Sequence, residues 1–188
     1  MTAPAWFQTR ASRTVYEGFS TVRLDTVLTP SGEEVEREVV VHTDAVAIVP
    51  ITAESEVLLL RQYRQPLGRY LLELPAGKLD VPGEPPETTA RRELQEEVHR
   101  TAERWQHLTT FHNSAGWSTE RTHVYLARDL QEVGPPDGFE ADSEEADMEV
   151  VVVPFDVALA RMHQGELTDA KTVVGLALAA AVLGAPRG

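Results

Sequence analysis

The chain contains no cysteine among its 188 residues. This absence excludes disulfide bonds, thiolate zinc sites and cysteine nucleophiles, and it is compatible with a reducing cytosol. Basic residues are also scarce, because 17 Lys and Arg stand against 30 Asp and Glu, which gives a formal net charge of −13. Binding to nucleic acid or to an anionic membrane surface depends on Lys and Arg. We therefore expect neither nucleic acid nor a membrane as a partner.

Long apolar runs are absent as well. The longest, at residues 173–183, has 11 residues, whereas a helix that spans a bilayer needs about 20. The first 13 residues contain no apolar segment of signal-peptide length. These observations predict a cytoplasmic protein. Hydrophobic residues make up 42% of the chain, which is ordinary for a folded domain with a sizeable core.

Alternating or continuous apolar segments predict a protein rich in strands. The first two segments flank a Thr-Pro-Ser-Gly turn at residues 29–32, so they are expected to form a β-hairpin. Pro66 and Gly68 predict a loop at residues 64–70, and the Gly- and Pro-rich segment 75–86 is expected to be irregular. Strands are expected at residues 21–28, 35–42, 45–51, 57–63, 106–111, 123–128 and 148–153.

A helix is predicted at residues 87–99, where Ala90, Leu94 and Val98 recur every four positions and form an apolar stripe. Two more helices are expected near the end of the chain. One covers residues 154–162, and the other begins at a cap, Thr168 or Asp169, and ends near residue 183. Strands before and after a central helix indicate an α/β fold in which a mixed sheet lies between helical layers.

The central helix carries the residues that indicate chemistry. Glu93, Glu96 and Glu97 are spaced three and four positions apart, so their carboxylates share one face beside the apolar stripe. Like charges at this spacing repel, and a hard divalent cation, which prefers oxygen ligands, would offset the repulsion. Glu84 in the preceding loop can fold back onto this face, and Arg92 can pair with Glu96 or Glu84. The alternative is a solvated acidic face with salt bridges.

Segment 77–100 resembles the Nudix box, whose pattern is Gly, five residues, Glu, seven residues, then Arg-Glu-apolar-any-Glu-Glu-any-Gly-apolar. Glu84 and the segment 92–97 match it in register. There are three departures: six residues separate Gly77 from Glu84, His99 replaces the closing glycine, and Arg100 replaces the apolar residue after it. The glycine normally ends the helix in a left-handed conformation. Since His can adopt that conformation at some cost, we expect an altered helix end and an intact site.

The flanking segments resemble the ADP-ribose pyrophosphatase branch of this family. The resemblance covers about residues 16–183. Ala115 occupies the position at which this branch has a proline associated with ADP-ribose preference. It implies a Nudix α/β/α sandwich with a mixed sheet and an N-terminal β-hairpin extension. It also implies hydrolysis of ADP-ribose to AMP and ribose 5-phosphate, or of a related nucleoside diphosphate sugar. The segments are Leu-Leu-Leu-Arg-Gln-Tyr-Arg at 58–64, Glu-Leu-Pro-Ala-Gly at 73–77, Ser-Ala-Gly-Trp-Ser-Thr-Glu at 114–120 and the acidic residues at 144–149.

Carried over to matching positions, the resemblance implies a role for each site residue. Arg92 would orient the glutamates, and Glu144 or its neighbour Glu145 would activate the attacking water. Glu84 would lie behind the metal ligands or bridge to the metal through water. The implied substrate-binding residues are Arg37, Arg64 and Glu120. The implied ligands of Mg²⁺, with Mn²⁺ as the alternative ion, are the Ala76 carbonyl, Glu93, Glu97 and Glu96, the last also counted as catalytic.

The resemblance further implies a homodimer whose protomers exchange N-terminal strands. Residues 1–43 would form the exchanged strand region and residues 44–188 the Nudix hydrolase domain, so that Arg37 would reach a site partly built by the other chain. An alternative function is a domain that senses ADP-ribose or another nucleotide without hydrolysing it. Such domains usually lose glutamates of the box, whereas Glu93, Glu96 and Glu97 are all present here.

Overall fold

The structure is a computed structural model that describes residues 6–136, 138 and 147–184. The chain divides into two compact units. The first consists of residues 1–44 together with 112–121, and the second consists of residues 45–111 together with 122–188.

The first unit contains an antiparallel three-stranded sheet formed by β1 (Gln8–Glu17), β2 (Thr21–Leu28) and β3 (Glu34–Val41). Strands β2 and β3 pair in register from Thr21 opposite Val41 to Leu28 opposite Glu34, which confirms the predicted hairpin. Strand β1 was not predicted, because all ten of its residues are exposed and it has no apolar face. It pairs with the edge of β2 through backbone hydrogen bonds, which do not require an apolar face.

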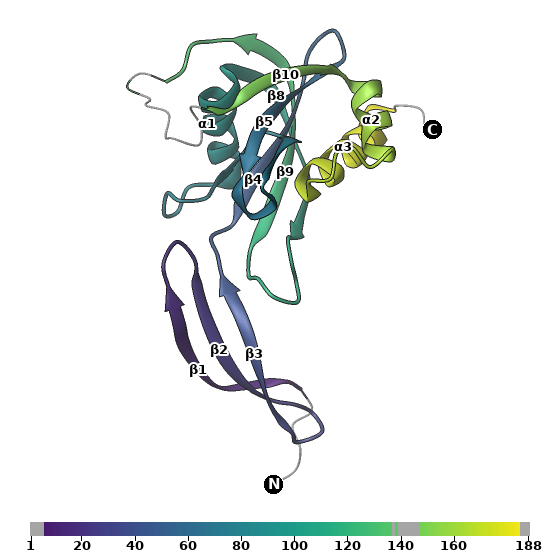
Figure 1. Cartoon of the computed structure of the whole chain (residues 1–188). Coiled ribbons are helices and arrows are strands. Elements are labelled where there is room, and N and C mark those ends of the chain that lie inside the picture. The colour runs from purple at the N-terminus through teal and green to yellow at the C-terminus, as the bar shows by residue number, and fades with distance from the viewer. Residues whose placement is uncertain (1–5, 137, 139–146, 185–188) are drawn as a thin grey trace. The chain divides into compact units, whose positions relative to one another are not determined.

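The second unit contains nearly all of the remaining described elements (Figure 1). Its helices are α1 (Pro86–Val98), α2 (Phe155–His163) and α3 (Ala170–Leu183), with a short 3₁₀ helix at Gln65–Leu67. Its strands are β4 (Ala45–Ile51), β5 (Glu56–Arg64), β6 (Arg69–Glu73), β7 (Ala76–Lys78), β8 (Arg100–His112), β9 (Arg121–Glu132) and β10 (Glu149–Pro154).

These strands form a mixed sheet, as predicted. In the described residues the order is β10-β5-β4-β9-β8, with β6 added to β5 and β7 added to β4. Strands β4 and β9 run parallel, whereas β5 is antiparallel to β6 and β10. Helix α1 lies on one side of this sheet and helices α2 and α3 lie on the other, as Figure 1 shows. The expected α/β/α sandwich is therefore confirmed.

Alternate residues of the central strands pack into two separate cores, since successive side chains of a strand point to opposite faces. The core beneath α1 includes Val46, Ile48, Leu58, Leu60, Ala90, Leu94, Val98 and Tyr125. The core beneath α2 and α3 includes Val49, Ile51, Val57, Leu59, Leu74, Val124, Leu126, Phe155, Leu159 and Leu176. The continuous apolar character of β4 and β5 follows from this burial on both faces.

Three predictions about loops and strand lengths were wrong in part. The expected loop at 64–70 is a tight turn around Gly68, which has a φ of 62°, and it leads into β6 paired with β5. The expected irregular segment 75–86 begins with the short strand β7 on β4. Strand β8 is longer than the predicted 106–111. Strand formation in these segments depends on a neighbouring edge, which local composition does not reveal.

Of the two predicted caps of the last predicted helix, Thr168 and Asp169, the structure shows Asp169, whose carboxylate accepts a hydrogen bond of 3.0 Å from the Thr172 backbone N–H. None of the helices within residues 6–136 and 147–184 is long and apolar enough to cross a membrane.

Candidate active site

Helix α1 presents the candidate carboxylates. It begins at Pro86, directly after Pro85, where the fixed φ of proline suits the first helical turn. Ala90 and Leu94 are fully buried in the core beneath the helix, and Glu93 lies on the same side with only 7% of its surface exposed. The predicted helix and its apolar stripe are therefore confirmed. Packing of this stripe holds the neighbouring glutamates against the sheet.

Arg92 is the centre of the acidic cluster. Its Nη1 atom lies 2.9 Å from Glu96 Oε2 and 3.0 Å from Glu93 Oε1. Its Nη2 atom lies 3.2 Å from Asp80 Oδ1 and 4.0 Å from Glu84 Oε2. The predicted pairing with Glu96 or Glu84 is thus present with both. One guanidinium holds four carboxylates from the helix and the preceding loop.

The Arg92 guanidinium stays positively charged in this setting. Burial by itself would lower its pKa, but the charges of Glu93, Glu96 and Asp80 outweigh burial and raise the pKa above its usual value. Its Nε atom is buried and has no hydrogen-bond partner among the described residues. The carboxylates thus contact only the outer nitrogens of Arg92, which leaves a polar atom of the cluster unsatisfied.

Gly77 allows the Glu93 carboxylate to approach the backbone of β7. A Cβ atom at this position would overlap the carboxylate group of Glu93. Gly77 pairs with Val46 of β4, so the strand has little freedom to move away. Gly77, the first glycine of the matched pattern, therefore lets the Glu93 carboxylate lie against the backbone of β7, and there is no space for a side chain at this position.

Replacing Gly77 by Ala is expected to lower the catalytic efficiency by roughly a hundredfold, because displacement of a site group by about 1 Å can cost that much. The new methyl group must push Glu93 out of its position. Steady-state kinetics at saturating metal would measure the effect. Gly134→Ala is the matched control, since a Cβ atom there meets no atom within 4 Å. Equal activity of the two variants would contradict the prediction.

Ala76 and Glu97 are in direct contact. The Ala76 backbone N–H donates a hydrogen bond of 2.8 Å to Glu97 Oε2. This bond joins the first residue of β7 to the last turn of α1, 21 residues later. Two of the residues predicted as metal ligands are thereby brought together. Whether the Ala76 carbonyl binds a metal stays a prediction.

Helix α1 ends at His99, which adopts the left-handed conformation with a φ of 54° and a ψ of 44°. Its backbone N–H donates to the carbonyl oxygens of Gln95 and Leu94, so the last turn closes as a glycine would close it. The expected alteration of the helix end is therefore absent, because His99 adopts the left-handed conformation that glycine normally supplies.

Replacing His99 by Gly is expected to stabilise the protein by about 0.5–1 kcal/mol, because glycine removes the steric cost of left-handed backbone. Urea unfolding monitored by circular dichroism would measure the change. His163→Gly is the control, since His163 has regular helical backbone in α2 and its replacement should be destabilising. A loss of stability in His99→Gly would show that the contact of the His99 ring with the Gln95 carbonyl matters more.

Two residues of this cluster were missed by sequence reasoning. Thr89 donates a hydrogen bond of 2.7 Å from its hydroxyl to Glu84 Oε2, which holds the loop glutamate against the helix. Asp80 contacts Arg92 from the irregular segment, 12 residues earlier in the chain. Thr89 lies only five residues after Glu84, and this short separation was a signal that the two side chains could be in contact. Nothing in the sequence indicated Asp80.

Arg64, a predicted substrate-binding residue, pairs with Glu73 of β6. Its Nε and Nη2 atoms donate hydrogen bonds of 2.8 and 2.6 Å to the two Glu73 carboxylate oxygens. This ion pair was not predicted, and it fixes the direction of the guanidinium at the end of β5. A role of Arg64 in binding substrate stays a prediction.

Four further predicted site residues belong to other parts of the chain. Arg37 is on β3 in the first unit, where its Nη1 atom donates to the Glu36 carbonyl. Glu120 also belongs to the first unit, and its Oε1 atom lies 3.6 Å from His42 Nδ1. Glu144 and Glu145 lie outside the described residues. The roles of all four predicted residues stay predictions.

The donor chemistry of this cluster, which consists of carboxylate oxygens, suits a hard divalent cation. Within residues 6–136, 138 and 147–184, no three His, Asp or Glu side chains are close enough together to hold a metal ion. However, Glu93 and Glu96 both approach the same positively charged nitrogen of Arg92, which shows that these two carboxylates can converge on one cation. Carboxylate oxygens are the ligands that Mg²⁺ and Mn²⁺ prefer.

Comparisons with known proteins identify the family and the fold of this chain. A sequence model of the NUDIX domain matches residues 41–173. The ADP-ribose pyrophosphatase of Mycobacterium tuberculosis (strain ATCC 25618 / H37Rv) is 44% identical over 171 residues, which cover 90% of this chain and 81% of that protein. The ADP-ribose pyrophosphatase of Bacillus subtilis (strain 168) is 40% identical over 147 residues, with 78% and 77% covered. The crystal structure of an ADP compounds hydrolase has the same fold, with a TM-score of 0.84, 24% identity and 95% of both chains covered.

Proposed function

Because this chain belongs to the Nudix family, we propose that it hydrolyses the diphosphate bond of ADP-ribose, giving AMP and ribose 5-phosphate, or that of a related nucleoside diphosphate sugar. The observation that carries this proposal is the pair Glu93 and Glu96, which converge on one cationic atom at the matched helix. The two relatives named as ADP-ribose pyrophosphatases support the choice of substrate.

Nudix hydrolases generally depend on a divalent metal, and we assign Mg²⁺, with Mn²⁺ as the alternative. Its ligands would be Glu93, Glu96, Glu97 and the Ala76 carbonyl. When bound, the metal neutralises the diphosphate and lowers the pKa of a water molecule. Arg92 holds the carboxylates of Glu93 and Glu96 in position.

The remaining roles belong to side chains that act on water and substrate. Glu144 or Glu145 takes the proton of the attacking water as general base. Arg37 and Arg64 donate hydrogen bonds to phosphate oxygens, which the forked guanidinium group suits. Glu120 approaches the sugar or the metal. In this proposal a glutamate activates the water, and the two arginines bind the phosphate groups.

A product assay tests the proposed function. Incubation of the full chain with ADP-ribose and Mg²⁺ should release AMP and ribose 5-phosphate, and EDTA should abolish the release. A panel of other nucleoside diphosphate sugars would then rank the substrates, which matters because Ala115 replaces the proline of this branch. Full activity in EDTA would refute the metal mechanism. Tight binding of ADP-ribose without AMP release would favour the sensing alternative.

A homodimer with exchanged N-terminal strands is part of the proposal, with residues 1–43 as the exchanged region and 44–188 as the hydrolase domain. Large apolar side chains of the N-terminal segment are exposed in the single chain, which a partner surface would cover. These are Trp6, Phe7, Val15, Tyr16 and Phe19. Light scattering should give twice the 20.8 kDa mass of one chain. A monomer with full activity would refute the dimer.

A further inference from the structure

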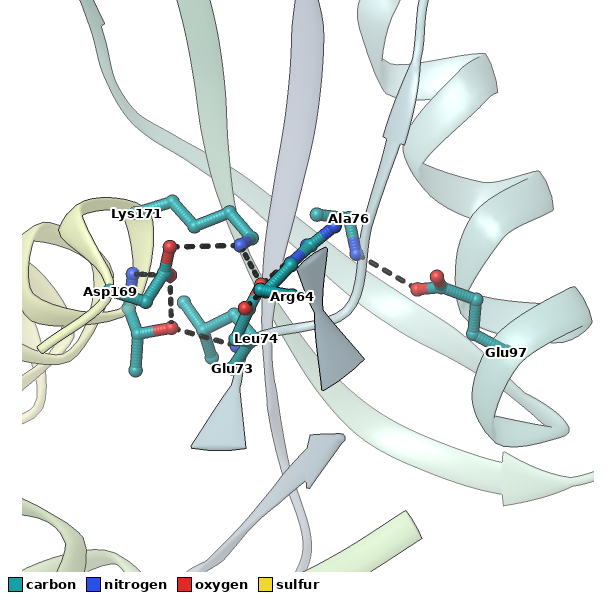
Figure 2. Close-up of polar contacts among 8 residues, drawn as sticks. Arg64, Glu73, Leu74, Ala76, Glu97, Asp169 and Lys171 are labelled. Carbon is teal, nitrogen blue, oxygen red and sulfur yellow. Dashed lines mark hydrogen bonds and ion pairs between the residues drawn. The ribbon is translucent and has the colours of Figure 1, made fainter. Parts of the chain in front are cut away.

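Glu73 is a buried carboxylate at the end of β6, with 1% of its surface exposed. It accepts hydrogen bonds from Arg64 of β5 and from Lys171 Nζ of α3 (Figure 2). Burial by itself would raise the pKa of Glu73, but the hydrogen bonds from Arg64 and the charge of Lys171 outweigh burial and hold the pKa below its usual value. Glu73 therefore connects two elements of the second unit as an ionised group.

The N-terminus of α3 continues this network. Lys171 Nζ lies 3.1 Å from Asp169 Oδ1, while Asp169 Oδ2 accepts hydrogen bonds from the backbone N–H and the hydroxyl of Thr172. The hydroxyl of Thr172 in turn accepts a hydrogen bond of 2.9 Å from the backbone N–H of Leu74, next to Glu73. Thr172 is fully buried, so water cannot replace it as the acceptor.

The segment from Leu74 to Ala76 is thereby held at three consecutive residues. The Leu74 backbone N–H donates a hydrogen bond to the Thr172 hydroxyl. The Pro75 carbonyl accepts a hydrogen bond of 2.9 Å from the Ile48 N–H. The Ala76 N–H donates a hydrogen bond to the Glu97 carboxylate. Figure 2 shows Leu74 between the side of α3 and Ala76, with Glu97 beyond Ala76 on α1. The segment links the two helical layers through the sheet.

Close packing keeps α3 in place beside this segment. A Cβ atom at Gly175, one turn after Thr172, would lie 2.5 Å from Leu74 Cδ1 and 3.0 Å from Val49 Cγ2. The absence of a side chain at Gly175 lets the helix axis approach Leu74. A movement of the N-terminus of α3 would therefore move the backbone that leads to Ala76.

We propose that Thr172 and Lys171 are positioning residues for the metal site, acting through Glu73 and Leu74 on the Ala76–Glu97 contact. This inference rests on the proposed function in that Ala76 and Glu97 are taken as metal ligands. Residues that orient metal ligands typically change metal affinity by roughly tenfold to a hundredfold when they are replaced. Helix α3, which carries none of the box residues, thus holds the Ala76–Glu97 contact in place.

The test combines two measurements on the full chain. Thr172→Val keeps the shape of the side chain but removes the acceptor of the Leu74 N–H. We expect amide exchange at Leu74 and Ala76 in metal-free protein, followed by NMR, to accelerate by roughly tenfold. We expect Mn²⁺ binding, measured by the electron paramagnetic resonance of free Mn²⁺, to weaken by roughly tenfold to a hundredfold. Thr172→Ser restores the hydroxyl and should restore both quantities.

Two further variants separate positioning from stability. Leu183→Ala removes apolar contacts at the opposite end of α3, so it destabilises the helix without touching the network. It should leave Mn²⁺ affinity and the exchange of Ala76 relative to the rest of β7 unchanged. Lys171→Met keeps the aliphatic part of the side chain and removes the ammonium group. It provides a second test of the proposal if Thr172→Val does not fold. Like Thr172→Val, it should weaken Mn²⁺ binding.

The inference is overturned if Thr172→Val and Lys171→Met match Leu183→Ala in both Mn²⁺ affinity and Ala76 exchange. Neither measurement uses a substrate, so an inactive protein would refute the proposed function and leave this comparison intact. If the wild-type chain bound no Mn²⁺, the proposed metal site would fail. The exchange rate of Ala76 would then still decide whether α3 positions this segment.

Discussion

Replacing Glu97 by Gln is expected to lower kcat by about 10³- to 10⁴-fold, since a bound metal contributes several kcal/mol to the stabilisation of the transition state. Gln retains a carbonyl oxygen that can accept the hydrogen bond of the Ala76 N–H. The substitution therefore removes the negative charge and leaves the local contact. Steady-state kinetics and Mn²⁺ binding should both detect the loss.

Glu87→Gln is the matched control for this variant. Glu87 lies on the same helix, but it pairs with Arg91 on the exposed surface and takes no part in the acidic cluster. Its replacement should change stability by no more than about 0.5 kcal/mol and leave kcat unchanged. Normal Mn²⁺ affinity and activity in Glu97→Gln would remove Glu97 from the proposed metal ligands.

Replacing the general base by Gln is expected to lower kcat on the order of 10²- to 10⁴-fold at saturating metal. The two candidates are Glu144 and Glu145, and each variant is the control for the other, because the two residues are adjacent and chemically identical. The amide cannot take a proton from water, whereas it keeps the size of the side chain. The variant of the true base should show the loss and its neighbour should not.

The pH profile distinguishes a base from a residue that only binds substrate. A general base must be ionised to act, so kcat of the wild type should rise with pH through the pKa of this group. That rise should disappear in the variant of the true base and persist in the other variant. Full activity of both variants would exclude Glu144 and Glu145 as the general base.

The helix that carries the site was predictable because its signals are local. The apolar stripe of Ala90, Leu94 and Val98 depends only on the helical repeat, and it places Glu93 at the edge of the core. The pairing of Arg92 with Glu96 is one helical turn long and follows from the same repeat. Strands β4 and β5 were predicted for a similar reason, since burial on both faces requires continuous apolar segments.

The missed elements depend on partners that are distant in the sequence. Strand β1 has no buried residue, and β7 has only three residues, so neither has an apolar pattern to detect. Both strands exist because an edge of another strand pairs with them. The bond from Leu74 to Thr172 joins residues 98 positions apart, and its acceptor is an ordinary threonine of a helix.

The sequence by itself determined the family pattern, the acidic face of α1 and the two-sided core, because helical and strand periodicities are properties of neighbouring residues. Only the tertiary structure decided which groups meet these carboxylates. The space that Gly77 leaves for Glu93, the Ala76 bond to Glu97 and the anchoring of Leu74 by α3 all depend on how strands and helices pack. Packing brings together residues whose separation along the chain carries no information about their contact.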